Sequence, residues 1–298
     1  MKEFFKIIVP IVTYPVLMGT CLLLHYLILD LDFLDLDFSL QIATYIPVAV
    51  GLTVITLMEL KFPHRQEWLA KRGDVLNDLS YMFLVQVLLV KILSFFFSIT
   101  LLKMLRSSGY TFDRLWPDTW PVYTQAVLMV LSADFLRYWL HRLSHKWMLL
   151  WRLHAVHHSP HKLYWINVGR FHPIEKGLQF LFDSLPFIVL GVSGKVLALY
   201  FVFYAINGFF QHCNIELKLG PLNYIVSGPE LHRWHHSVVL GESNKNYGNN
   251  LIIWDLVFGT WYLPKTKMVR ELGLKNRKYP LDFLSQLKTP FKKGMDQG

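Results

Sequence analysis

Charged residues are scarce in this chain. Asp, Glu, Lys and Arg make up 17% of its 298 residues, hydrophobic residues make up 53%, and the mean hydropathy is +0.32. Soluble proteins typically carry about 25% charged residues. The composition therefore argues against a soluble globular protein and favours a protein embedded in a membrane.

Cysteine is nearly absent, and several cofactor motifs are missing. Cys21 and Cys213 lie far apart beside or within apolar segments, so no disulfide framework is expected. The chain has no Gly-x-Gly-x-x-Gly dinucleotide motif and no Cys-x-x-Cys pair for an iron–sulfur cluster, so any electrons it uses must come from a separate protein or molecule. It also has no His-Glu-x-x-His motif, which disfavours a zinc-dependent hydrolase.

Several apolar runs approach or exceed the length needed to cross a hydrocarbon core about 30 Å thick. We expect membrane helices at about 4–29, 41–60, 79–102 and 121–140. The first run has no clear signal-peptide cleavage site, so we expect it to remain as a helix. Lys91 lies near the middle of the third helix, and its sequence context identifies no partner.

Two shorter apolar runs, 177–190 and 195–210, are separated by two glycines suited to a turn. They predict either a shallow helical hairpin or two tight spans, and both return the chain to the side on which it entered. The predicted fold is therefore all-α: a polytopic helical bundle of about four transmembrane helices plus this hairpin, with a histidine-rich helical cap. We expect three parts, at 1–120, 121–263 and 264–298.

Charge is distributed unevenly between the connections. The segment 30–39 has four aspartates and no Lys or Arg, whereas 61–77 carries four Lys and Arg residues. The positive-inside rule puts 61–77, and with it His141, on the cytoplasmic face; Arg106 and Arg114 in an outer loop run against this assignment. The net charge of +9 comes largely from nine Lys and Arg residues at 265–293, so no nucleic-acid partner is needed to explain it. That segment is either solvated or a surface for anionic lipid or an acidic redox partner.

Histidines concentrate in three clusters, HRLSH at 141–145, HAVHH at 154–158 and HRWHH at 232–236. On a helix, residues three and four apart share a face, so each cluster presents two or three imidazoles in one direction. Their eight imidazoles exceed the three or four that one tetrahedral zinc needs, and they suit two metal ions such as iron, zinc or copper. The clusters therefore predict a dinuclear metal centre.

Other polar residues lie near the clusters in sequence. His212 ends an apolar helix and is a candidate ninth ligand, whereas His172 is either a ligand or a supporting residue. His161 follows a proline and is expected at the surface. Metal-bound imidazoles usually donate their second N–H to a carboxylate or a carbonyl. The candidates for such support are Asp134, Glu175 and Asp255.

These motifs, together with RFHPIE at 170–175 and NYGNNLIIWDLVFGTWY at 246–262, resemble the fatty acid hydroxylase/sterol desaturase superfamily of integral-membrane di-iron enzymes. The resemblance covers roughly residues 120–263. It implies a non-haem centre of two iron ions that activates O2 to hydroxylate or desaturate a C–H bond of a lipid. The implied iron ligands are His141, His145, His154, His157, His158, His212, His232, His235 and His236.

The resemblance also has consequences beyond the ligands. Members with a paired histidine on this helix carry it four residues before His212, where this chain has Gly208, and Asn207 and His172 are the candidates for the missing ligand. A separate electron donor is implied, such as a b-type cytochrome, a ferredoxin or a reduced pterin. The lipid could be a fatty acyl chain, a sterol, an ether lipid or a terpenoid. The alternatives to an oxygenase are a zinc-dependent membrane hydrolase and a metal-binding or metal-transport membrane protein.

Overall fold

The computed structural model describes residues 2–31, 35–109, 112, 115–292 and 294–295. Within them the chain is mostly helical, with isolated β-bridges and no β-strand, so the predicted all-α fold is confirmed. Parts of three predicted features, residues 32–34, Arg114 and Lys293, lie outside the described residues. The helices are α1 Lys2–Leu29, α2 Leu36–Lys61, α3 Arg72–Ser80, α4 Val90–Phe96, α5 Leu102–Ser107, α6 Val122–Ser144, α7 Met148–His158, α8 Pro173–Asp183, α9 Leu185–Val189, α10 Gly194–His212, α11 Pro229–His235, α12 Leu240–Ser243, α13 Ile253–Val257 and α14 Phe283–Gln286.

Three helices of the described residues are long and apolar enough to cross a membrane: Ile7–Leu29 in α1, all of α2, and Arg72–Leu105. Their outer faces expose large apolar side chains, among them Leu57 at 60% and Phe95 at 70%. Such faces are stable in lipid and costly in water. The predicted membrane helical bundle is confirmed.

The third of these helices is longer than its apolar run. It begins at Arg72 because the Asp74 carboxylate accepts the backbone N–H of Lys71 at 2.9 Å and caps the first turn. It then runs through α3, α4 and α5, which are joined by two π-helical stretches. Lys91 lies on its exposed face, and its Nζ is 5.8 Å from the ring centroid of Tyr45 on α2. The sequence identified no partner for this lysine, and the structure shows that its partner is the aromatic ring of Tyr45.

Helix α6 is long enough to span a membrane but is not among the three helices with a sufficiently apolar composition. Its polar stripe explains this, since Asp134 and Tyr138 are fully buried against the rest of the protein. The stripe consists of Asp134, Tyr138, His141 and His145, which follow one another three or four residues apart, and it faces protein. A crossing by α6 stays a prediction.

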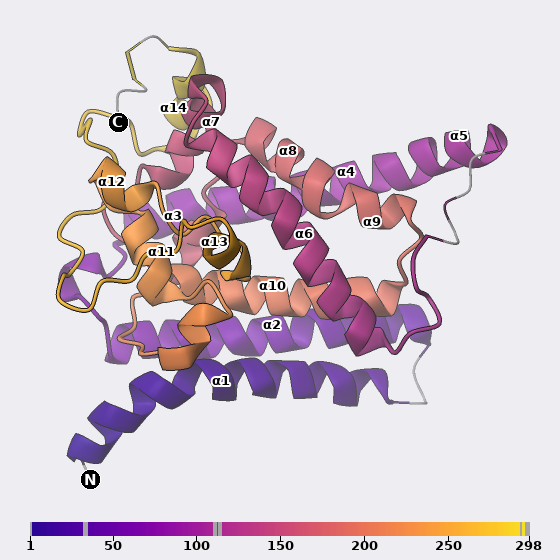
Figure 1. The fold of residues 1–298 in the computed structure, drawn as a ribbon, viewed down its shortest axis with the longest axis horizontal. Coiled ribbons are helices and arrows are strands. Elements are labelled where there is room, and N and C mark those ends of the chain that lie inside the picture. The colour runs from indigo at the N-terminus through magenta and orange to yellow at the C-terminus, as the bar shows by residue number, and fades with distance from the viewer. Residues whose placement is uncertain (1, 32–34, 110–111, 113–114, 293, 296–298) are drawn as a thin grey trace.

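The predicted hairpin is present as α8, α9 and α10. Gly191 takes the positive φ of +72° that the turn requires, and the Ser193 hydroxyl accepts the Val196 N–H to cap α10. Helix α10 contacts α1, α2 and α6, and these helices run alongside or across it in Figure 1. At Gly51 of α2 a Cβ would lie 2.2 Å from Ile206 Cδ1, so α2 and α10 pack closely. Helix α10 is thus the centre of the bundle.

Helices α7, α11, α12 and α13 gather at the end of the bundle where α2 and α10 finish (Figure 1). The basic C-terminal segment packs against this cap. The Gly273 N–H donates to the His236 carbonyl at 3.1 Å, and the Gln286 side chain donates to the Ser159 hydroxyl at 2.7 Å. Burial of Leu272 and Leu274 holds the segment in place, and Lys275 stays exposed.

The loop between α12 and α13 is tied to α6 by a buried carboxylate. Asp134 accepts the Asn250 N–H and side-chain amide, both at 2.8 Å, and the Leu251 N–H at 2.5 Å. Asp255 of α13 accepts the N–H groups of Tyr247 and Gly248 at 2.8 and 2.7 Å. These bonds satisfy backbone N–H groups of the loop, which have no hydrogen-bond partner within a helix or a sheet.

Gly248 is the point of closest approach in this loop. A Cβ at Gly248 would lie 2.3 Å from the Leu251 carbonyl oxygen and 3.1 Å from an Asp255 carboxylate oxygen. We expect Gly248→Ala to lower the free energy of unfolding by about 1–3 kcal/mol, because the loop must shift and weaken these bonds. Gly241→Ala is the matched control, since nothing lies within 4 Å of its Cβ. Thermal unfolding in detergent, followed by circular dichroism, measures the difference; equal transitions for the two variants would contradict it.

Candidate metal centre

Nine histidines from four helices meet in the cap and divide into two groups. In each group the nitrogen atoms that could bind a metal lie within 4.8 Å of one another. All nine residues were predicted from the sequence to lie together. The five-histidine group is His141, His145, His154, His158 and His235, and the four-histidine group is His157, His212, His232 and His236.

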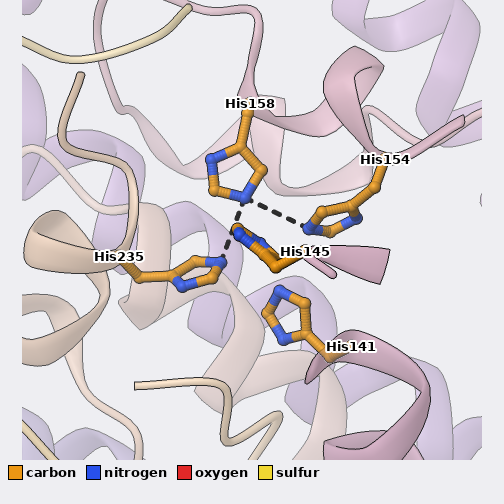
Figure 2. A group of neighbouring side chains, drawn as sticks. All are labelled: His141, His145, His154, His158 and His235. Atoms are coloured by element: carbon orange, nitrogen blue, oxygen red, sulfur yellow. Dashed lines mark hydrogen bonds between the residues drawn. The ribbon is translucent and has the colours of Figure 1, made fainter. Parts of the chain in front are cut away.

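Figure 2 shows the rings of the five-histidine group turned toward a common space. The Nε2 atom of His158 lies 3.1 Å from the Nε2 atoms of both His154 and His235. His141 and His145 reach the same space from the last turn of α6, and the His141 ring centroid is 4.4 Å from that of His235.

The four-histidine group has the same arrangement. The His232 Nε2 atom lies 3.0 Å from those of His212 and His236. The His157 Nε2 atom lies 3.2 Å from that of His236. His212, at the end of α10, is therefore placed among the clustered histidines by the hairpin.

The two groups interleave. Helix α7 gives His154 and His158 to one group and His157 to the other, and the cluster at α11 is divided in the same way. The rings of His158 and His236, from different groups, stack with centroids 4.5 Å apart. Two adjoining positions for metal ions result.

In six of the nine histidines the Nδ1 atom faces an oxygen outside the shared space. In five of the pairs the oxygen belongs to a backbone carbonyl or a side-chain amide, which only accepts hydrogen bonds, so those five Nδ1 atoms carry the proton; in the sixth pair His154 Nδ1 faces a carboxyl oxygen of Glu175. In all six the ring orientation is set from outside. The pairs are His141 with Tyr247 O (2.8 Å), His145 with Asn244 Oδ1 (3.2 Å), His154 with Glu175 Oε1 (2.7 Å), His157 with Arg170 O (3.3 Å), His212 with Asn167 Oδ1 (2.7 Å) and His235 with Lys245 O (2.8 Å).

The inward-facing nitrogens then carry lone pairs. The Nε2 atoms of His141 and His145 are buried and have no hydrogen-bond partner in the described part of the chain. The Nε2 atom of His158 faces two other Nε2 atoms and could donate to one at most. Lone pairs packed this closely repel one another, and a bound cation removes that repulsion. The residues present therefore fit metal ions bound by imidazole.

The electrostatics of the cap also favour neutral imidazoles that can bind metal ions. Burial, and then the neighbouring imidazoles, hold the pKa values of His154, His157 and His158 well below the usual range. Burial lowers the pKa of His235 to about 4. These rings are neutral at physiological pH, and neutral imidazole is the form that binds a metal.

The three carboxylates predicted to support the ligands differ in what they contact. Glu175 accepts from His154 directly. Asp134 and Asp255 contact no clustered histidine in the hydrogen bonds of the described residues; they hold the loop whose Tyr247 carbonyl orients His141. Their support of the site is therefore indirect.

His172 and Asn207 lie outside both groups. His172 caps α8, since its Nδ1 accepts the Ile174 N–H at 3.2 Å and its Nε2 lies 3.2 Å from the Leu287 carbonyl. The Asn207 side-chain oxygen accepts the Tyr14 hydroxyl at 2.7 Å. Both side chains are thus engaged elsewhere, and His161 is exposed, as predicted.

Sequence reasoning missed most of the groups that orient the rings. Asn167 and Asn244 are loop amides with no motif of their own, and backbone carbonyls such as those of Arg170 and Lys245 carry no side-chain signal. The available signals were Tyr247 and Arg170, which lie inside the family-like segments 246–262 and 170–175.

A cavity of about 370 Å³ leads from the histidines to the membrane helices. Its inner end includes His141, His154, His157 and His232, and its wall passes Gly208. The position lacking a paired histidine is thus part of the cavity wall. The outer end includes Tyr45, Leu79, Val87 and Phe201, large apolar residues whose side chains are exposed on the faces of membrane helices and of α10.

Comparison with known proteins agrees with the motifs. Residues 126–260 match the model of the fatty acid hydroxylase family. Ornithine lipid hydroxylase OlsE from Rhizobium tropici is 36% identical over 242 residues, which cover 80% of this chain and 73% of that protein. Alkylglycerol monooxygenase from Homo sapiens is 30% identical over 180 residues, but the aligned part spans only 38% of its length.

Very-long-chain aldehyde decarbonylase GL1-6 from Oryza sativa subsp. indica is 29% identical over 157 residues, which cover 24% of its length. No solved structure matches the chain significantly. The family match includes all nine clustered histidines, and the alignment with the hydroxylase extends over most of both proteins. This chain belongs to the fatty acid hydroxylase/sterol desaturase superfamily.

Proposed function

We propose that this protein is a multi-pass membrane oxygenase that uses two iron ions, O2 and external electrons to hydroxylate a lipid. The observation that carries the proposal is the convergence of nine imidazoles in two adjoining groups at the inner end of an apolar cavity. The outer end of that cavity is lined by membrane-facing side chains. The site thus joins redox-metal ligands to a path for an apolar molecule.

The five-histidine group would hold one iron ion and the four-histidine group the other, through the ring nitrogens that face inward. The bound ions would supply the redox chemistry that splits O2, so that one oxygen atom enters a C–H bond and the other leaves as water with two electrons and two protons from outside. The protein's own residues hold the imidazoles in place through Glu175, Asn167 and the carbonyls already described.

The cavity wall would orient the substrate and exclude water. Apolar side chains from α2, the Arg72–Leu105 helix and α10 line its outer part, so a hydrocarbon chain displaces no strongly bound solvent there. Hydroxylation is favoured over desaturation because the relatives named above are a lipid hydroxylase and a monooxygenase.

The metal centre would lie on the cytoplasmic side. The basic connection that follows α2 meets the cap, where the Arg65 guanidinium donates to the Val269 carbonyl at 2.6 Å. The positive-inside rule puts such a connection in the cytoplasm. The histidines lie at the same end of the bundle (Figure 1), so external electrons would arrive from that side.

Metal analysis combined with an oxidation assay tests the function. Purified protein should contain about two iron ions per chain and should convert a lipid extract to hydroxylated products only when O2 and a reductant are both present. Zinc with hydrolysed lipid, or reversible metal flux across vesicles, would overturn the proposal.

His157→Ala should remove a ligand from the four-histidine group and leave the fold in place. We expect oxidation to be abolished and the iron content to fall by about one ion per chain, because that group keeps only three imidazoles. His161→Ala is the control, since that exposed histidine lies next to the same cluster and outside both groups. Retained oxidation in His157→Ala would count against the ligand assignment.

Glu175→Gln should keep the size of the support for His154 and remove its carboxyl group. We expect the affinity for metal to fall by about 10- to 100-fold, the usual effect of losing such a partner. Retention of iron during dialysis against a graded series of chelator concentrations measures it. The control is Glu216→Gln, which alters a Glu–His pair with His64 that includes none of the clustered histidines. Equal iron retention in the two variants would show that the carboxylate is dispensable.

The electron donor would dock on exposed basic residues of the C-terminal segment. Replacing Lys275, Arg277 and Lys278 by Gln should slow reduction by an acidic donor by about tenfold at low salt, because electrostatic steering is lost. Lys103→Gln is the control, since it lies on α5 at the opposite end of the bundle (Figure 1). Stopped-flow reduction at two ionic strengths reports the effect, and an unchanged rate in the triple variant would remove the docking site.

A further inference from the structure

Lys176 is a buried cation on the wall of the cavity. The residue is 6% exposed, and its Nζ lies 3.4 Å from the Tyr204 hydroxyl and 5.6 Å from the centroid of that ring. No carboxylate of the described residues forms an ion pair with it. An ammonium group buried without an anionic partner is costly, so an anion from outside the chain would be bound favourably there.

The nearby carboxylates are engaged elsewhere. Glu175 accepts from His154 at 2.7 Å and from the Gln179 side chain at 3.2 Å. Asp183 accepts from the Arg137 guanidinium at 2.7 Å, which makes a neutral pair on the same wall. Lys176 is therefore the group on this side of the cavity that has a charge to offer.

The helix that carries Lys176 adds to the positive potential. Helix α8 begins at Pro173, so Lys176 lies in its first turn, where the helix dipole disfavours a cation and favours an anion. The cation is thus placed where the helix gives it no stabilisation. An anion in the cavity would interact favourably with both the ammonium group and the helix end.

Lys176 lines the same cavity as the clustered histidines His141, His154 and His157. Glu175, the residue before Lys176, contacts His154 directly, and Arg137 lies one helical turn before His141 on α6. The opposite end of the cavity is apolar and reaches the membrane-facing side chains of Tyr45 and Val87. The cavity therefore carries a buried cation on a wall that also includes clustered histidines, and its outer part toward the bilayer is apolar.

We propose that Lys176, with the Tyr204 hydroxyl, binds the carboxylate or phosphate of an anionic lipid whose chain extends along the cavity toward the membrane. Together with the proposed function, on which this step rests, such binding has a consequence for the product. The oxidised carbon lies close to the polar end of the lipid and not near the methyl end of its chain.

Binding can be tested without turnover. Full-length protein in a neutral detergent is titrated with palmitate, hexadecyl phosphate and hexadecanol, and complexes are quantified by native mass spectrometry. We expect at least one of the two anions to bind about tenfold or more tightly than hexadecanol, a difference of about 1.4 kcal/mol. The tighter anion identifies carboxylate or phosphate as the natural group. Equal binding of all three by the wild-type protein would overturn the proposal.

Variants assign the preference to one side chain. Lys176→Met should make the three probes bind equally, whereas Lys195→Met, at an exposed lysine in the first turn of α10, should keep the preference. A preference that survives Lys176→Met would overturn the assignment. Iron content is measured on the same samples, so loss of the anion preference is distinguishable from failure of the metal centre.

The oxidised position gives a second readout. Tandem mass spectrometry of the product should place the new oxygen within a few bonds of the anionic group. Oxidation toward the methyl end would overturn the predicted orientation even if anion binding were found.

Discussion

The structure depends on bringing nine neutral imidazoles into one small space, where the inward nitrogens of the rings held through Nδ1 carry lone pairs. Nε2 atoms such as those of His158 and His154 lie 3.1 Å apart, a distance at which two lone pairs repel. What opposes this repulsion is the set of outward hydrogen bonds, in which rigid oxygens hold Nδ1 and so fix the direction of each ring. Bound metal would turn the same geometry from repulsive to favourable, which links the stability of the cap to its chemistry.

Much of the surrounding fold serves those outward bonds. The loop around Tyr247 is held by two buried carboxylates, Asp134 and Asp255, and the segment from Trp165 to Gly169 places the Asn167 amide against His212. The C-terminal segment closes over the cluster at α11 through the His236 carbonyl. Most of the rest of the protein consists of apolar helices, and its polar hydrogen bonds are concentrated in the cap. There they satisfy the N–H and C=O groups of non-helical backbone, which could not be left unpaired in lipid.

Residue spacing was enough to predict which histidines meet. The separations of three and four residues in the clusters put their rings on one face of a helix, and the hairpin predicted at 177–210 accounted for His212. Spacing could not show that His157 and His158 belong to different groups, because that depends on how α7 crosses α11. Nor could it show the carbonyl partners, the capping role of His172, or the packing of the C-terminal segment. Each of these is decided by tertiary contacts between distant parts of the chain.

Because the clusters at α7 and α11 each give histidines to both groups, metal binding at one position affects the other position. A metal ion in the five-histidine group would immobilise His158 and His235, and through their neighbours His157 and His236 it would also order half of the other group. The second ion then meets a site whose conformational entropy has already been lost. Binding of the first ion would thereby lower the entropic cost of binding the second.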